Sequence, residues 1–330
     1  MERPKPLTAQ AIARRFFRHE NAVLIVVLVA LIAGMGVITK GLTTKPVNMM
    51  NILLQSSMRG YAAVGQAFVI LTTGIDLSVG GLGLLCSILG ALLMTKASYN
   101  IVGHPMDVYT VIPIMIFFGV SVGTLNGLAV SRIGMPPLIV TLAMWQICNG
   151  VAFQLCGGKS IAEQPSNLTF FGQGHVAGVA VPVIIFIAIA VMAYFVLNYT
   201  AFGRSVYAVG GNPVSAWLSG INVKNTQLIV YSVSGCLAGL AGVVMTGRIM
   251  SASMRTLEGL ELDSIAAVCI GGVSLMGGRG SLIGVIIGVL IIGVINNAMS
   301  VLGASPAVVG IVKGAIIFTA VAIDYLRRRG

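Results

Sequence analysis

Charged residues are scarce in this chain, and acidic residues are scarcer still. Only 9% of the 330 residues are charged, with 9 Asp and Glu against 20 Lys and Arg. Soluble domains contain about 25% charged residues. A soluble fold could not bury enough of the 57% of residues that are hydrophobic, whereas lipid solvates such surface. The composition therefore indicates an integral membrane protein.

Metal-ligand patterns are also lacking. The three histidines, at 19, 104 and 175, are scattered along the sequence, and the five cysteines form no CxxC motif. A zinc site needs several such ligands close together. The sequence therefore supports no bound metal, and the cysteines read as small hydrophobic residues within apolar stretches.

No phosphate-binding loop is present. The pattern GxxxxGK[ST] does not occur, and the glycine cluster from Gly271 to Ser281 lacks its Lys-Ser/Thr pair. We therefore expect no cofactor on this chain, and any ATP and Mg²⁺ must be used by another chain. The glycines instead predict a tight turn beside Arg279. Nucleic acid is not expected as a partner, because the cations lie at the termini and in connectors rather than on one face.

Long apolar stretches dominate the sequence. A bilayer core requires about 20 apolar residues per helix. This length predicts an all-α fold of about ten spans, near 21–38, 51–71, 79–94, 108–130, 136–156, 181–198, 227–247, 261–277, 281–302 and 307–325. The second, third and eighth of these are the weakest and are candidates for broken or re-entrant segments.

The distribution of cations predicts the orientation. With a cytoplasmic N-terminus, 12 Lys and Arg fall inside and 6 outside, which agrees with the positive-inside rule. Both termini are basic, so both should be cytoplasmic. The predicted organisation is a cytoplasmic segment 1–20, one transmembrane domain 21–325 with a cytoplasmic loop 200–226, and a cytoplasmic tail 326–330.

A weak internal repeat suggests two halves of inverted topology. Gly74-Ile75-Asp76-Leu77 and Gly259-Leu260-Glu261-Leu262 each lie beside a glycine-rich span. The two copies are five spans apart, which would place them on opposite sides of the membrane. Transporters are often built from such inverted repeats.

The connector Thr200 to Val223 is long and rich in helix-terminating signals. Asn212 is a favourable N-cap and Pro213 a favourable first helical residue, so a short helix is expected over 214–219, ended by Gly220. Trp217 would form an apolar ridge with Leu218. Such a ridge indicates either a docking site for a partner or a helix resting on its own bundle. If Gly211 has a positive φ, a side chain there would disturb the turn.

The same connector resembles a known family. FGRSVYAVGGNPVSAWLSGINV is similar to the cytoplasmic signature of ribose-, xylose- and galactose-type ABC sugar permeases, as are LTTGIDLSVGG (71–81), GLELDSIAAVCIGGVSLMGGRGSLIG (259–284) and INNAMSVLG (295–303). The resemblance extends from about residue 50 onward. It implies a ten-helix permease of the bacterial inner membrane that moves a monosaccharide or related polyol.

The resemblance also implies partners and site residues. The expected partners are a separate ATP-binding subunit, a periplasmic sugar-binding protein, a second permease copy and the lipid bilayer. The residues expected to contact the ATPase are Gly203, Arg204, Gly210, Gly211, Asn212, Pro213, Trp217, Leu218 and Gly220.

Ionisable residues at membrane depth are functional candidates by default. Asp76, with Ser78, either caps a helix or lines a path, and it is the one serious intramembrane carboxylate. Long cations near an interface can reach the headgroups. Arg59 and Lys313 therefore either extend to the headgroups in this way or take a direct part in transport. The further path candidates are Asn126, Asn149, Asn296 and Asn297, because uncharged polar groups suit sugar hydroxyls. Hydrogen bonds between helices would explain the asparagines equally well.

Two other classes of function compete with the permease. An ion-coupled carrier that works alone would normally carry several intramembrane carboxylates. An intramembrane enzyme would need a catalytic constellation that this sequence lacks. The chain itself is therefore not expected to be an enzyme, and the sequence does not specify the sugar.

Overall fold

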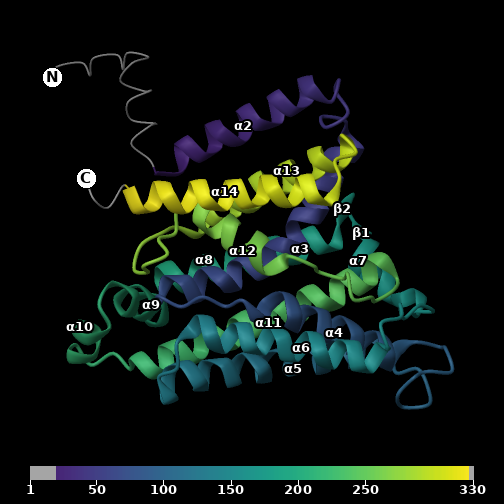
Figure 1. Cartoon of the computed structure of the whole chain (residues 1–330), viewed down its shortest axis with the longest axis horizontal. Helices are drawn as coiled ribbons and strands as arrows, with labels where there is room; N and C mark the ends of the chain where they lie inside the picture. Colours follow the sequence, from purple (N-terminus) through teal and green to yellow (C-terminus); the bar gives the residue numbers. More distant parts are fainter. Residues whose placement is uncertain (1–19, 327–330) are drawn as a thin grey trace.

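The computed structural model describes residues 20–326 as a bundle of helices lying side by side (Figure 1). The predicted terminal segments 1–20 and 326–330 fall almost entirely outside the described residues. The long helices are α2 (Glu20–Ile38), α3 (Pro46–Leu71), α4 (Ser78–Met94), α5 (Val108–Leu128), α6 (Pro137–Cys156), α8 (Val181–Tyr199), α11 (Val223–Ile249), α13 (Leu282–Val301) and α14 (Pro306–Leu326).

Shorter elements connect these helices. They are η1 (Ala129–Ile133), η2 (Ser166–Leu168), α7 (Thr169–Gln173), α9 (Ala201–Gly211), α10 (Pro213–Leu218) and α12 (Leu260–Ile270). Two strands, β1 (His175–Val176) and β2 (Val179–Ala180), form a small antiparallel hairpin with His175 opposite Ala180. The all-α architecture predicted from the sequence is confirmed apart from this hairpin.

Each of the ten predicted spans coincides with a helix, but the helices differ in their ability to cross a bilayer. By length and composition, six helical segments qualify within the described residues: α2, α5 with η1, α6, α8, α11 and α13. The prediction that 261–277 is one span is wrong in its extent, because α12 ends at Ile270. Gly272 and Gly277 beyond it have positive φ, which confirms the predicted glycine turn.

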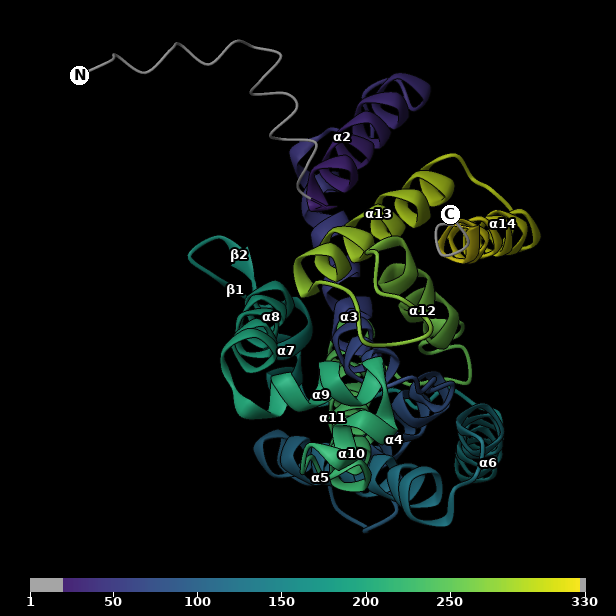
Figure 2. The ribbon, with the colours of Figure 1, turned by 90° about the vertical axis from the view of Figure 1, so that its left-hand side faces the viewer.

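Helix α11 is the centre of the bundle and packs against α3, α4 and α5. Figure 2 views the bundle along the helices and shows α11 and α3 inside, with α2, α6 and α14 at the edge. Gly119 and Gly123 of α5 face Gly235 of α11 so closely that a Cβ on Gly235 would overlap with the carbonyl oxygen of Gly119. The four-residue spacing of Gly119 and Gly123 thus provides a face on which α5 and α11 approach closely.

The two ends of the bundle carry different elements. The beginning of α2 and the end of α14 lie at the same end as α9 and α10, whereas α7 and the strands lie at the opposite end (Figure 1). Asn21 at the start of α2 donates to Ser281 before α13, at 3.3 Å. The first and last described helices thus have their outer ends at the same end of the bundle.

Candidate functional site

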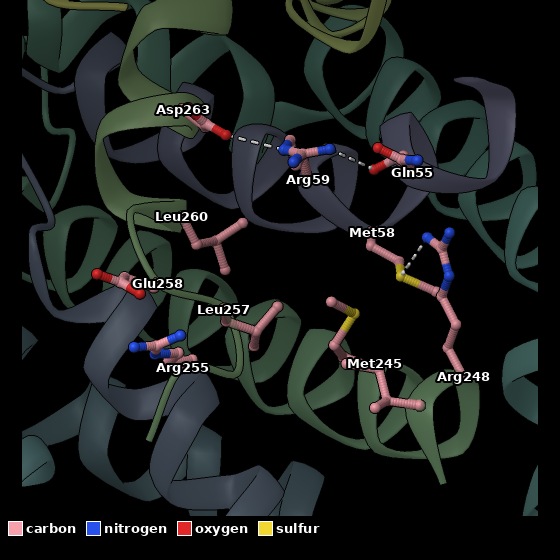
Figure 3. A pocket seen from close by; sticks show the side chains of 11 residues that line it. Gln55, Met58, Arg59, Met245, Arg248, Arg255, Leu257, Glu258, Leu260 and Asp263 are labelled. Carbon is pink, nitrogen blue, oxygen red and sulfur yellow. Dashed lines mark hydrogen bonds and ion pairs between the residues drawn. The ribbon is translucent and has the colours of Figure 1, made fainter. Parts of the chain in front are cut away.

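A buried ion cluster joins three helices that are far apart in the sequence. Nε of Arg59 on α3 donates to Oδ2 of Asp263 on α12 at 2.8 Å, and Nζ of Lys313 on α14 lies 2.8 Å from Oδ1 of the same carboxylate. Nδ2 of Asn296 on α13 lies 3.4 Å from Oδ2. Figure 3 shows the Arg59 and Asp263 side chains pointing toward each other. The side chain of Asp263 is 4% exposed, against 25% for Arg59.

This cluster bears on two expectations. Because α3 begins at Pro46, Arg59 lies near the middle of a 26-residue helix, and its guanidinium is paired with a carboxylate, which favours a role within the bundle over contact with the headgroups. Asp76 is also not the one carboxylate in the interior, since Asp263 is buried as well. Asp263 lies in the first turn of α12, directly after the repeated Gly259-Leu260-Glu261-Leu262 motif. That position was the signal in the sequence that could have identified it as a candidate.

The other asparagine candidates lie elsewhere. Asn297 exchanges two hydrogen bonds with Asn48, at 2.8 and 2.9 Å, and so ties α13 to α3. Asn149 donates to the carbonyl of Trp145 within its own helix at 2.8 Å. The Asn297 pair is a hydrogen bond between helices, as one of the two interpretations predicted, whereas the Asn149 bond lies within α6 and is not. Among the described residues, neither side chain hydrogen-bonds to the ion cluster.

A second polar cluster surrounds Asp76, which is fully buried. Its Oδ1 accepts from the backbone N of Ser78 at 2.9 Å, so Asp76 caps the start of α4, as one of its two interpretations predicted. Its Oδ2 accepts from Oγ of Ser234 on α11 at 2.7 Å, and Asn126 on α5 donates to Ser78 at 2.9 Å. Three candidates, Asp76, Ser78 and Asn126, are therefore brought together. Within residues 20–326, Asp76 belongs to no ion pair.

The beginnings of α4 and α12 meet inside the bundle. A Cβ on Gly80, in the first turn of α4, would overlap with Oε2 of Glu261, in the first turn of α12. From this point the helices run to opposite ends. Thr95 after α4 donates to the carbonyl of Ala162 in the segment before α7, while Gly271 after α12 packs against Gly284 of α13. The two copies of the weak repeat thus start two short helices of opposite direction.

The connector between α8 and α11 forms two helices. Oδ1 of Asn212 accepts from the backbone N of Val214 and of Ser215, both at 3.0 Å, which confirms the predicted cap. Gly220 after α10 has a φ of +84°. Within the predicted cytoplasmic loop 200–226, residues 201–211 form a second helix, α9, which the sequence analysis did not predict. Gly211, at the end of α9, is not among the described glycines that have a positive φ. Backbone conformation therefore gives no reason to expect that a side chain at position 211 would disturb the turn.

The outer face of α10 is apolar and exposed. Trp217 is 67% exposed and Leu218 72%, while Ala216 on the opposite face is buried. Arg204 on α9 is also exposed. The helix therefore does not rest its large side chains on its own bundle, and a second surface must cover them if they are to leave water.

Helix α9 is held against the core by backbone contacts. A Cβ on Gly203 would overlap with the carbonyl oxygen of Leu197, and one on Gly210 with that of Leu71 at the end of α3. The same carbonyl of Leu71 accepts from the backbone N of Gly278 at 3.0 Å. One point at this end thus joins α9, the start of the 72–77 connector and the glycine turn before α13.

The described residues offer no metal site, since residues 20–326 contain no group of three or more His, Cys, Asp or Glu placed to hold an ion.

Charges and amides buried between long apolar helices, with an exposed apolar helix at one end, define a class of protein. This is a multi-pass membrane protein with buried polar clusters between its helices.

Comparisons with known proteins identify that class more closely. The pattern of the family described as branched-chain amino acid transport system / permease component matches residues 48–321. The ribose import permease protein of Bacillus subtilis is 40% identical over 282 residues, which cover 85% of each chain. The fructose import permease protein of Rhizobium meliloti is 38% identical over 95% of this chain and 88% of its own.

A third relative, the galactose/methyl galactoside import permease protein of Escherichia coli, is 38% identical over 85% of this chain and 87% of its own. No solved structure matches. The chain belongs to this family of transport-system permeases, and it is a multi-pass protein of the bacterial inner membrane. The match begins at residue 48, so it includes both polar clusters, α9 and α10, and leaves out α2.

Proposed function

We propose that this chain is the permease subunit of an ABC importer that passes a monosaccharide from a periplasmic binding protein into the cytoplasm. The observation that carries this proposal is α10, a capped helix with an exposed apolar face on the end of the bundle where the charge distribution places the cytoplasm. The names of the relatives, which describe import permeases for ribose, fructose and galactose, support a sugar as the substrate.

The proposed orientation places α9, α10 and both termini in the cytoplasm, with ten membrane crossings in all. The positive-inside distribution supports it. The opposite directions of α4 and α12 support an arrangement in two inverted halves, in which α4 and α12 are the broken helices at the middle.

We expect an accessibility experiment to confirm this orientation. A single cysteine at Arg204, in a chain without native cysteines, should resist a membrane-impermeant thiol reagent applied to intact cells, because α9 would lie inside. One at Lys159, an exposed residue shortly after the end of α6, should react. Rapid external labelling at 204 would contradict both the orientation and the role of α10.

The transmission of force follows from the contacts of α9. An ATPase that moves α10 would also move Gly210, and through it the end of α3, the 72–77 connector and the turn before α13. These segments lead directly to Asp76 and, through α12, to Asp263. A conformational change requires such an element with different contacts in the two states. The two polar clusters are therefore the proposed moving parts of the sugar path.

Hydrolysis of ATP with Mg²⁺ is proposed to occur on the separate ATPase, and a second copy of the permease would complete a homodimer. We expect the purified chain in liposomes to show neither ATP hydrolysis nor concentrative uptake of ribose, fructose or galactose. Addition of the ATPase and the binding protein should restore both. Uphill uptake by this chain alone, driven by a proton or sodium gradient, would instead establish an ion-coupled carrier.

A further inference from the structure

A pocket of about 420 Å³ lies among α3, α11, α12 and the connector 250–259 (Figure 3). This volume falls within the range of small-molecule sites, about 300–1,000 Å³. Its polar lining consists of Gln55, Arg59, Arg248, Arg255, Glu258 and Asp263. Met58, Met245 and Leu257 add apolar surface. The pocket therefore combines the few polar groups and the apolar walls that are typical of a binding site.

The pocket runs inward from the surface. Arg255 and Glu258 at its outer part are exposed, whereas Leu260 and Asp263 at its inner part are buried. Arg248 is in the last turn of α11, the end of the bundle opposite α9 and α10. In the proposed orientation, the pocket thus opens on the periplasmic half and ends at the ion cluster.

Several lining groups have unused hydrogen-bonding capacity. Within residues 20–326, the two ion pairs both involve Asp263, so Arg248, Arg255 and Glu258 take part in none. Arg248 is partly buried, yet the one hydrogen bond that its guanidinium makes among the described residues is to the sulfur of Met58, 3.7 Å away. A guanidinium carries five donors, and buried charges are normally paired. The pocket therefore offers the guanidinium donors of Arg248 and Arg255 and the carboxylate acceptor of Glu258 to a polar ligand.

The balance of charge indicates what kind of partner fits. Three arginines and two carboxylates face the same space, so a ligand of either charge would meet repulsion as well as attraction. A hydroxyl group both donates and accepts, and so satisfies either kind of side chain. A neutral ligand with several hydroxyls and an apolar C–H face matches the lining best.

We propose that this pocket is a sugar-binding site within the permease itself, in which Arg248, Arg255 and Glu258 hydrogen-bond the hydroxyls of a monosaccharide on its way to the Arg59–Asp263 pair. The proposal rests on the proposed function for its class of ligand. The binding protein would deliver the sugar, and this pocket would hold it briefly before the ion cluster moves.

The test is protection of a thiol inside the pocket. In a chain without its five native cysteines, Met245→Cys is reconstituted in nanodiscs and labelled with a small thiol reagent in the presence of D-ribose, D-fructose or D-galactose. We expect at least one sugar to slow labelling about tenfold at about ten times its Kd, as mass action requires. Val102→Cys, in the exposed 95–107 loop, should label at the same rate with or without sugar.

Substitutions on the rim identify the residues responsible. Arg255→Gln and Glu258→Gln change exposed side chains that make no ion pair, so the fold should persist and the labelling rate without sugar should be unchanged. Each should reduce the protection severalfold, whereas Lys159→Gln should not. Full protection in both rim variants, or no protection by any of the three sugars, would overturn the proposal. Protection without ATP-driven uptake would uphold the pocket and overturn the importer instead.

Discussion

Trp217→Ala should abolish sugar-stimulated ATP hydrolysis and uptake while leaving the permease folded in the membrane. The side chain is 67% exposed on α10, so its removal leaves no cavity in the bundle. Aromatic anchors commonly contribute about 2 kcal/mol or more to a protein interface, which corresponds to roughly 30-fold weaker docking. The measurement is co-purification of the ATPase with the variant, together with hydrolysis in the reconstituted complex.

Two further variants calibrate this effect. Asn212→Ala removes the side chain that caps α10 and should weaken docking less, by about 1 kcal/mol. Phe117→Ala removes an aromatic ring of similar exposure, 72%, from the middle of α5, and should leave docking unchanged. Trp217→Ala with normal docking and coupling would show that α10 is ordinary loop structure and that force enters elsewhere, such as the turn at Gly277 and Gly278.

The second large effect is expected for Asp263→Asn, which would leave Arg59 and Lys313 close together without a counter-ion. Removing one partner of a buried ion pair costs about 3–5 kcal/mol. Since both cations are about a quarter exposed, a loss of about 3 kcal/mol is expected here. The variant should unfold at a markedly lower temperature in detergent and should not support uptake.

The charge balance provides the matched controls. Asp263→Asn combined with Lys313→Met returns the cluster to its original net charge and should recover part of the lost thermal stability. Glu258→Gln removes an exposed acid that belongs to no ion pair, and its unfolding temperature should match that of the unmodified protein. If Asp263→Asn is as stable as Glu258→Gln, the ion cluster contributes nothing to holding α3, α12 and α14 together.

Local signals in the sequence predicted the local structure. Asn212-Pro213 and Gly220 marked the two ends of α10 because capping involves residues only two or three positions apart. The same is true of Asp76, whose carboxylate caps the helix that follows it. The ten helices were predicted by apolar length, which is also a property of single segments.

Tertiary contacts account for what was missed. Arg59, Asp263 and Lys313 are separated by 204 and 50 residues, so only the packed bundle shows that they meet. Helix α9 was not predicted within the connector, and glycines are poor helix formers. Here Gly203 and Gly210 are stabilised in a helix by close contacts with the carbonyls of Leu197 and Leu71, which residues with side chains could not make.

The ten-residue connector before α12 forms part of the pocket wall, whereas the buried Asp263 lies on the helix that follows it. Residues 250–259 form no helix, and a two-residue bridge between Ala252 and Ile161 is their link to the segment before α7. Replacement of its exposed residues, such as Arg255 and Glu258, changes the pocket wall outside the helix that carries Asp263. Relatives that carry different sugars could therefore vary the pocket wall independently of the buried charges. We expect differences among them to concentrate in this connector.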